Sequence, residues 1–103
     1  MNSIWPAVFF GHGNPMNAIQ SNGYTAAWRA MGMSMGKPHA ILMISAHWFV
    51  PEVAVTINSS PRTIHDFGGF PEELYEVQYP AGGDPELARR VQKLLAPVPV
   101  KAR

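Results

Sequence analysis

Two short, unbroken apolar segments constrain the fold of this chain more than any other feature. Residues 7–10 (AVFF) follow a proline and stop at a glycine, and residues 40–45 (AILMIS) run directly into a second turn. A strand that faces solvent on one side alternates apolar and polar residues, whereas a strand covered on both faces is apolar throughout. Both segments therefore predict buried strands of a mostly parallel sheet flanked by helices, an α/β fold.

A helical pattern separates these two segments. Residues 24–31 (YTAAWRAM) place their apolar side chains at i, i+3, i+4 and i+7, which predicts a helix with one apolar stripe. The pattern breaks at Gly32, and the methionines at 31, 33 and 35 fit gap-filling or a mobile turn. A strand, a helix and a strand in this order predict a parallel pair joined by a crossover.

Three later segments have clear starts or stops. Residues 53–57 (VAVTI) are rich in β-branched residues and predict a third strand. Residues 71–75 predict a short helix that begins at a proline and carries two glutamates near its positive end. Asp84 as the N-cap and Pro85 in the first turn predict a last helix, which Pro97 ends.

The remaining segments lack regular patterns. Residues 58–69 show no period, and a loop of this length in a compact domain is usually functional or disordered. Residues 96–103 (APVPVKAR) resemble the approach to a strand that does not follow. Three strands form a thin sheet with an unpaired edge, since sheets average about 5 to 6 strands. We therefore expect the chain to be the first portion of a larger domain.

Composition excludes several classes of function. A length of 103 residues suffices for one domain, and a net charge of +1 without a run of Lys or Arg argues against nucleic acid as a partner. The chain has no cysteine, so any metal must be held by His, Asp or Glu. Its opening residues are not expected to form a signal peptide, and no apolar stretch approaches the about 20 residues that span a bilayer. We expect a cytoplasmic protein without membrane contact.

Two histidines stand where the predicted strands end. Ligands of an open parallel sheet bind beyond the carboxyl ends of its strands, and His12 follows the first strand as His47 follows the second. If those strands are neighbours, both imidazoles enter one crevice and supply part of a metal site, which a carboxylate or a third histidine completes. Glycines at 11 and 13 would permit a sharp turn around His12. Each histidine alone is more often a turn or core residue, and only the occurrence of both at equivalent strand ends makes the metal interpretation equal to it, so both interpretations stay open.

A second polar group lies in the unpatterned loop, where His65 precedes Asp66. Such a pair can orient an imidazole for acid–base chemistry or substrate contact, but it is also a common loop-stabilising hydrogen bond. His39 precedes the second strand, at the wrong end for the metal site, and is expected on the surface. The segment GHGNP offers a weaker phosphate-binding interpretation, because it lacks the third glycine and the lysine of nucleotide loops.

Three segments together share their motifs with a known family: PAVFFGHGNPMNAI, AILMISAHWF and PRTIHDFGGFPEELYEVQYPAGGDPELARRVQKLLAP. They resemble the amino-terminal portion of the LigB-type (class III) extradiol ring-cleaving dioxygenases, within the branch of the 4,5-DOPA extradiol dioxygenases. The resemblance implies that residues 1–103 are the N-terminal part of a single dioxygenase domain, whose members run to more than twice this length. One local departure is Asn14, where the family commonly has serine; both residue types cap a turn or a helix start.

The resemblance also implies a chemistry. His12 of GHG and His47 of SAHW match two metal-binding histidines of the family, with iron(II), Fe(2+), as the active metal and zinc, Zn(2+), as an ion that often occupies such sites. His65 and Asp66 of TIHDFGG match a family motif, to which we assign substrate binding. The family's remaining ligand and its acid–base histidine have no counterpart here, so no catalytic residue is predicted within this chain.

Two hypotheses of different classes follow. In the first, the longer protein is an iron-dependent extradiol dioxygenase that cleaves a catechol such as DOPA with O2, and the 103-residue chain alone is inactive. In the second, the chain is a catalytically inactive metal-binding or assembly fragment, whose exposed sheet edge pairs with a second copy to form a homo-oligomer.

Overall fold

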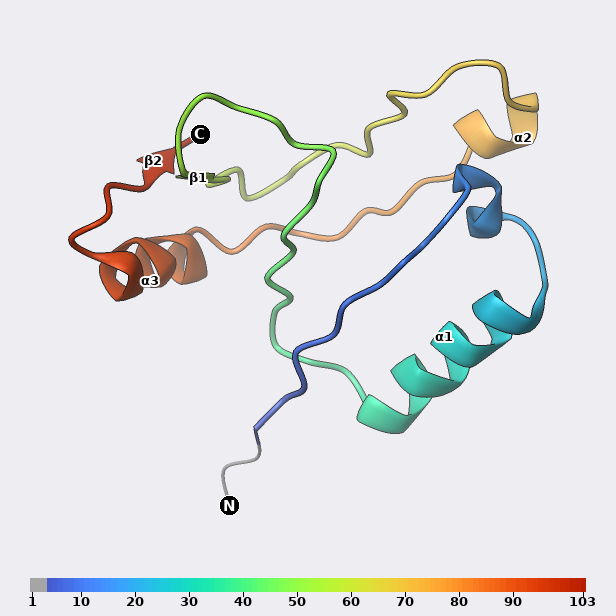
Figure 1. Ribbon diagram of the computed structural model, residues 1–103, viewed down its shortest axis with the longest axis horizontal. Helices are drawn as coiled ribbons and strands as arrows, with labels where there is room; N and C mark the ends of the chain where they lie inside the picture. The colour runs from blue at the N-terminus through green and yellow to red at the C-terminus, as the bar shows by residue number, and fades with distance from the viewer. Residues whose placement is uncertain (1–3) are drawn as a thin grey trace. The chain divides into compact units, whose positions relative to one another are not determined.

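A computed structural model describes residues 4–103, which fold into two compact units (Figure 1). Unit 1 contains the described residues up to Ser34 together with Phe67–Val77, and unit 2 contains Met35–Asp66 and Gln78–Arg103. The elements in chain order are the 3-10 helix η1 (Pro15–Ala18), α1 (Gly23–Met35), β1 (Ala54–Val55), α2 (Glu72–Tyr75), α3 (Pro85–Leu95) and β2 (Lys101–Ala102).

Helix α1 begins at a reciprocal cap. The backbone N–H of Asn22 donates to Thr25 Oγ1 (2.9 Å), and the backbone N–H of Thr25 donates to Asn22 Oδ1 (3.0 Å). Each side chain thereby satisfies a backbone donor that the helix itself leaves unpaired. The helix predicted over residues 24–31 is confirmed.

The end of α1 differs from the prediction. The helix continues through Gly32 to Met35 and stops before Gly36, whose φ is +74°. An internal glycine costs about 1 kcal/mol relative to alanine and does not by itself end a helix, whereas a left-handed glycine is a common residue immediately after one. The expectation of a turn was therefore wrong: the methionines at 31, 33 and 35 belong to α1.

Helix α2 carries the most deeply buried side chain of unit 1, Leu74, which is 2% exposed. The preceding loop folds back onto this helix through Gly69, whose φ is +79°. Tyr75 Oη donates to the carbonyl of Phe67 (3.1 Å) and accepts from the N–H of Phe70 (3.4 Å). The Phe67 ring lies 5.4 Å from the Phe70 ring and 5.1 Å from the Tyr75 ring, centroid to centroid. The short helix predicted over residues 71–75 is confirmed.

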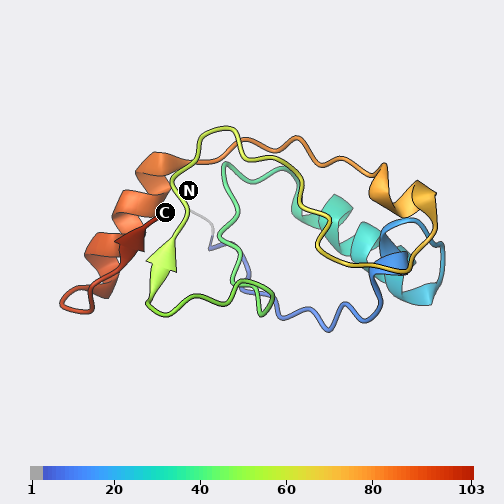
Figure 2. The ribbon, with the colours of Figure 1, turned by 90° about the horizontal axis from the view of Figure 1, so that it is seen from above.

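Unit 2 contains a parallel pair of strands (Figure 2). In its register Ala54 is opposite Lys101 and Val55 is opposite Ala102, and α3, which lies between the strands in the chain, packs against β1. The third predicted strand is therefore confirmed over its centre. The last residues were expected to approach a strand without forming one, which was wrong, because β2 is that strand.

Helix α3 has the predicted boundaries. Asp84 Oδ1 accepts from the backbone N–H of Leu87 (2.9 Å), Pro85 occupies the first turn, and the helix ends at Leu95, two residues before Pro97. Its inward side chain Ala88 is 3% exposed. The helix therefore forms where local capping predicts it.

The two apolar segments that predicted buried strands form no strand in residues 4–103. Phe9 is 96% exposed and Ile44 is 91% exposed. A strand covered on both faces needs neighbouring strands and helices around it, and in the described part of the chain only Leu74 and Ala88 are buried. The expectation of strands over residues 7–10 and 40–45 was therefore wrong for the described chain, while their pairing, which would join the two units, stays a prediction. Helices with a small parallel sheet are compatible with part of an α/β domain.

Residues 58–69 contain neither helix nor strand, as predicted. Within the region covered by the structure, no helix combines the length and the apolar content that a membrane crossing requires.

Candidate metal centre

His12 lies in a turn of unit 1, between an extended segment and η1, and its side chain is exposed. Its ring nitrogen Nδ1 is 3.0 Å from the carbonyl oxygen of Gly13. Because a carbonyl can only accept, Nδ1 carries the proton in the neutral ring and Nε2 carries the lone pair. A histidine whose second ring nitrogen donates to a carbonyl is the usual form of a metal ligand. His12 therefore fits the predicted role through Nε2.

The backbone of this turn depends on one of its two glycines. Gly13 has a φ of +65°, in the left-handed region that favours glycine, whereas the φ of Gly11 is not positive. Asn14 caps η1, because its Oδ1 accepts from the backbone N–H of Met16 (2.8 Å). The expectation that asparagine caps this position as serine would is thereby confirmed.

Hydrogen bonds through Asn17 and one aromatic contact connect the turn to α1. Asn17 Nδ2 donates to the carbonyl of His12 (2.8 Å), and Asn17 Oδ1 accepts from Asn22 Nδ2 (2.9 Å) at the start of the helix. On the other side of the turn, the Phe10 ring meets the Trp28 ring edge-on at 6.2 Å between centroids. Sequence patterns did not single out Asn17; the only signal was its position between the GHG turn and the helix start.

His47 lies in unit 2, in a short turn after residues 40–45, and is exposed. Its backbone N–H donates to Ser45 Oγ (3.1 Å), and the N–H of Trp48 lies 3.4 Å from the carbonyl of Ser45. The hydroxyl of Ser45 thus helps to close the turn, a common role for serine after a strand or helix.

His65 is half-buried and Asp66 is exposed, and both lie in the long loop of unit 2. The loop is held against residues 79–83 by two hydrogen bonds. Thr63 Oγ1 accepts from the N–H of Tyr79 (2.9 Å), and the carbonyl of Ser59 accepts from the N–H of Gly83 (3.0 Å). The loop that carries the predicted substrate-binding pair therefore has fixed flanks, while the binding role itself stays a prediction.

The candidate ligands belong to different units, His12 to unit 1 and His47 to unit 2. No group of three or more His, Asp or Glu side chains converges as a metal site among the residues from 4 to 103. The pairing of the two histidines around one ion therefore stays a prediction.

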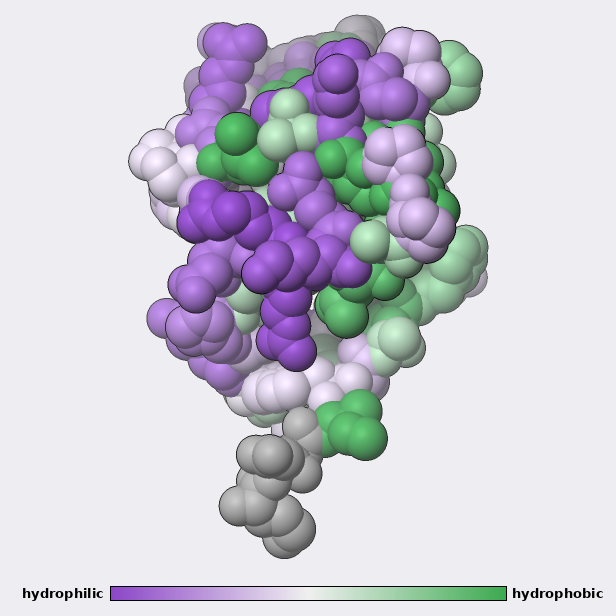
Figure 3. Space-filling view, turned by 90° about the vertical axis from the view of Figure 1, so that its left-hand side faces the viewer, coloured by the Kyte–Doolittle hydropathy of each residue, from purple (hydrophilic) through white to green (hydrophobic). Residues whose placement is uncertain are grey.

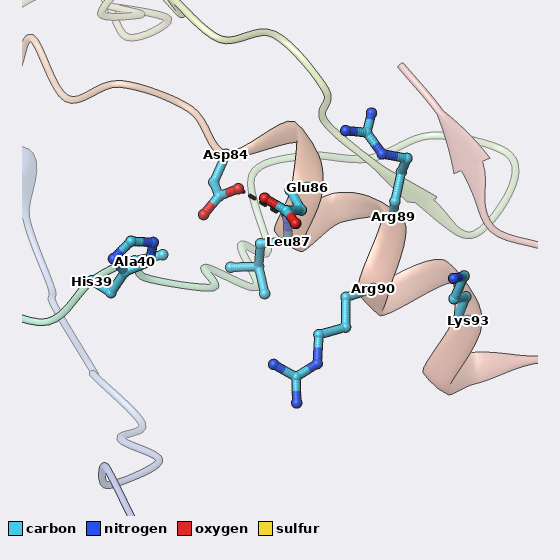
Figure 4. A pocket seen from close by; sticks show the side chains of 8 residues that line it. All are labelled: His39, Ala40, Asp84, Glu86, Leu87, Arg89, Arg90 and Lys93. Atoms are coloured by element: carbon cyan, nitrogen blue, oxygen red, sulfur yellow. Dashed lines mark hydrogen bonds between the residues drawn. The ribbon is translucent and has the colours of Figure 1, made fainter.

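Unit 2 has a hollow of about 680 Å³ beside α3 (Figure 4). His39 and Ala40 line it together with side chains of α3 and its cap, namely Asp84, Glu86, Leu87, Arg89, Arg90 and Lys93. Figure 3 shows hydrophilic side chains beside hydrophobic ones on the face that it draws. His39 is exposed, as predicted, and none of the candidate ligands or substrate-binding residues lines this hollow.

Comparison with known proteins shows which proteins this chain resembles. No protein-family model matches it. It is 54% identical over 95 residues to the 4,5-DOPA dioxygenase extradiol of Escherichia coli (strain K12), and 44% identical over 99 residues to the protein of that name from Beta vulgaris. A third such protein, from Portulaca grandiflora, is 38% identical over 97 residues.

These matches cover 92%, 92% and 90% of this chain but only 35%, 37% and 35% of the three relatives. The chain thus spans about a third of the length of the curated relatives that it matches. It is similar to proteins named 4,5-DOPA dioxygenase extradiol from a bacterium and from plants. The resemblance found in the sequence motifs is confirmed.

Proposed function

We propose that the protein to which this chain belongs is a non-haem iron-dependent extradiol dioxygenase, which opens the ring of a catechol such as DOPA with dioxygen. The observation that carries this proposal is the 54% identity, over 92% of the chain, to a protein named 4,5-DOPA dioxygenase extradiol. Residues 1–103 would be the N-terminal part of the catalytic domain and supply part of the active site, in a larger α/β domain and a cytoplasmic protein.

His12 and His47 would hold the metal in this proposal. Imidazole nitrogens suit iron(II) and zinc alike, and the hydrogen bond from Nδ1 of His12 to Gly13 leaves Nε2 as the ligand atom. When bound, the metal supplies open positions at which the two substrates meet. His47 is presented by a turn that Ser45 closes, so both ligands are carried by short turns with local hydrogen bonds.

His65 and Asp66 would bind the catechol. A neutral imidazole can donate to or accept from a phenolic hydroxyl, and a carboxylate can accept from one. The half-buried position of His65 favours a contact with an aromatic substrate over a purely solvated role. The remaining metal ligand and the acid–base residue would come from outside residues 1–103, so the 103-residue chain alone would not turn over substrate.

A second candidate, an inactive metal-binding or assembly fragment, is favoured by one observation. Ile41, Leu42, Met43 and Ile44 are 64%, 56%, 73% and 91% exposed. Contiguous exposed apolar side chains commonly mark an interaction surface. A second copy of this chain or the rest of the longer protein would cover them, and only the first of these makes a homo-oligomer.

The test uses the full-length protein that contains this chain, loaded anaerobically with iron(II). Intact mass, metal content and catechol cleavage are measured on one sample, for the wild type and for the variants His12→Ala and His47→Ala. Each variant is expected to lose both iron occupancy and ring cleavage.

The matched control is His39→Ala, which removes an exposed histidine of unit 2 that is no candidate ligand. This variant should keep wild-type iron occupancy and turnover. If His47→Ala keeps both iron occupancy and ring cleavage, the proposal is refuted. A wild-type protein that binds substoichiometric metal, cleaves no catechol and is dimeric would favour the assembly fragment.

A further inference from the structure

We infer that Asn17 is a positioning residue of the metal centre, which acts on the ligand His12 through its backbone carbonyl. The inference rests on the proposed function, in which His12 binds the metal. It follows from a line of hydrogen bonds that leads from the GHG turn through two asparagine side chains to the first turn of α1.

Asn17 uses both ends of its side-chain amide. Its Nδ2 donates to the carbonyl of His12 at 2.8 Å, and its Oδ1 accepts from Asn22 Nδ2 at 2.9 Å. Its backbone N–H also donates to the carbonyl of Asn14 at 3.0 Å, which fixes the main chain of Asn17 itself. The amide therefore has little freedom to turn, because both of its side-chain hydrogen bonds would be lost if it did.

Hydrogen bonds between Asn22 and Thr25 hold the other end of this line. Asn22 Oδ1 accepts from the backbone N–H of Thr25, and the Thr25 hydroxyl both accepts from the backbone N–H of Asn22 and donates to its carbonyl at 3.1 Å. Both polar atoms of the Asn22 side chain are thus used, one on the helix and one on Asn17. These hydrogen bonds connect the turn of His12 to α1, a helix of 13 residues.

The side chain of His12 is exposed, so burial does little to fix its direction. The hydrogen bond from its own ring goes to the adjacent Gly13, so it moves with the turn and cannot fix the turn against the rest of the protein. The bond from Asn17 instead connects the carbonyl of His12, in the preceding peptide unit, to a residue outside the turn. A metal ligand must be held close to its productive geometry by such outer partners, and their loss typically weakens metal affinity about 10-fold to 100-fold.

Two variants separate the parts of this contact. Asn17→Asp keeps an oxygen that accepts from Asn22 but cannot donate to the carbonyl of His12, and Asn17→Ala removes both bonds. The matched control is Asn58→Ala in unit 2, because the Oδ1 of Asn58 accepts a local hydrogen bond from the backbone N–H of Ser60 at 2.8 Å, in a different unit from His12.

Zinc affinity of the metal-free full-length protein is measured by calorimetry, and the absorption spectrum is recorded after loading with cobalt(II). Both Asn17 variants are expected to bind zinc about 10-fold more weakly and to show an altered cobalt spectrum, whereas Asn58→Ala stays within twofold of wild type. The thermal midpoint of each variant is measured beside it.

A merely structural role would lower the thermal midpoint of the Asn17 variants while leaving zinc affinity and the cobalt spectrum of the folded protein unchanged. That result overturns the inference. The variant His12→Ala separates this failure from a failure of the proposed function. If it binds zinc as tightly as wild type, His12 is not a ligand and the proposed function itself fails; if it loses zinc while the Asn17 variants do not, only the inference fails.

Discussion

Replacement of Gly13 by alanine tests whether the turn that carries His12 requires a left-handed residue. The φ of Gly13 is +65°, and this conformation costs a residue with a Cβ roughly 1–2 kcal/mol. A Cβ at Gly13 would lie 3.6 Å from Asn17 Nδ2, an ordinary contact, so no collision adds to the cost. Alanine also restricts the unfolded chain, which stabilises the protein by about 0.4–1 kcal/mol. The expected net effect is a loss of about 1 kcal/mol in the free energy of unfolding.

The matched control is Gly11→Ala, on the other side of the histidine. Gly11 has no positive φ, and a Cβ there would meet nothing within 4 Å. Only the effect on the unfolded chain applies, so this variant should gain about 0.4–1 kcal/mol. The two variants therefore differ by the backbone strain alone, roughly 1–2 kcal/mol.

Urea unfolding of the full-length protein, followed by circular dichroism, measures this difference as a shift of the midpoint at constant slope. Gly13→Ala should unfold at lower urea than wild type and Gly11→Ala at equal or higher urea. Equal midpoints for the two variants would refute the left-handed turn around His12.

Two further predictions concern packing in the two units. Leu74→Ala should destabilise the protein by about 2–5 kcal/mol in thermal or urea unfolding, because Leu74 is 2% exposed. Leu94→Ala, at a position 72% exposed, should stay within about 0.5 kcal/mol of wild type, and similar losses in both variants would contradict the assigned core. Gly83→Ala should also destabilise, because a Cβ there would collide with the carbonyl of Asn58, whereas one at Gly82 would lie 3.7 Å from the nearest backbone oxygen, so Gly82→Ala serves as its control.

The candidate site was predictable to the extent that it depends on local sequence. The position of His12 between glycines and the capping role of Asn14 both follow from residues within a few positions of each other, and the structure shows the turn and the cap. The contact from Asn17 to His12 was not predictable, because an asparagine five residues away carries no pattern that distinguishes it from a solvated one. The pairing of His12 with His47 depends on long-range placement and stays a prediction.

The sequence by itself determined the helices of this protein. Caps act through hydrogen bonds between nearby residues, and prolines and glycines act through the φ angles that they favour. Asp84 with Pro85 therefore starts α3 and Pro71 precedes α2 wherever the rest of the chain lies. Only the tertiary structure decided the strands. Apolar composition shows that a segment can be buried, but a strand needs a partner to accept its backbone hydrogen bonds. Residues 101–102 found that partner at residues 54–55, whereas residues 7–10 and 40–45 form neither helix nor strand in the described chain.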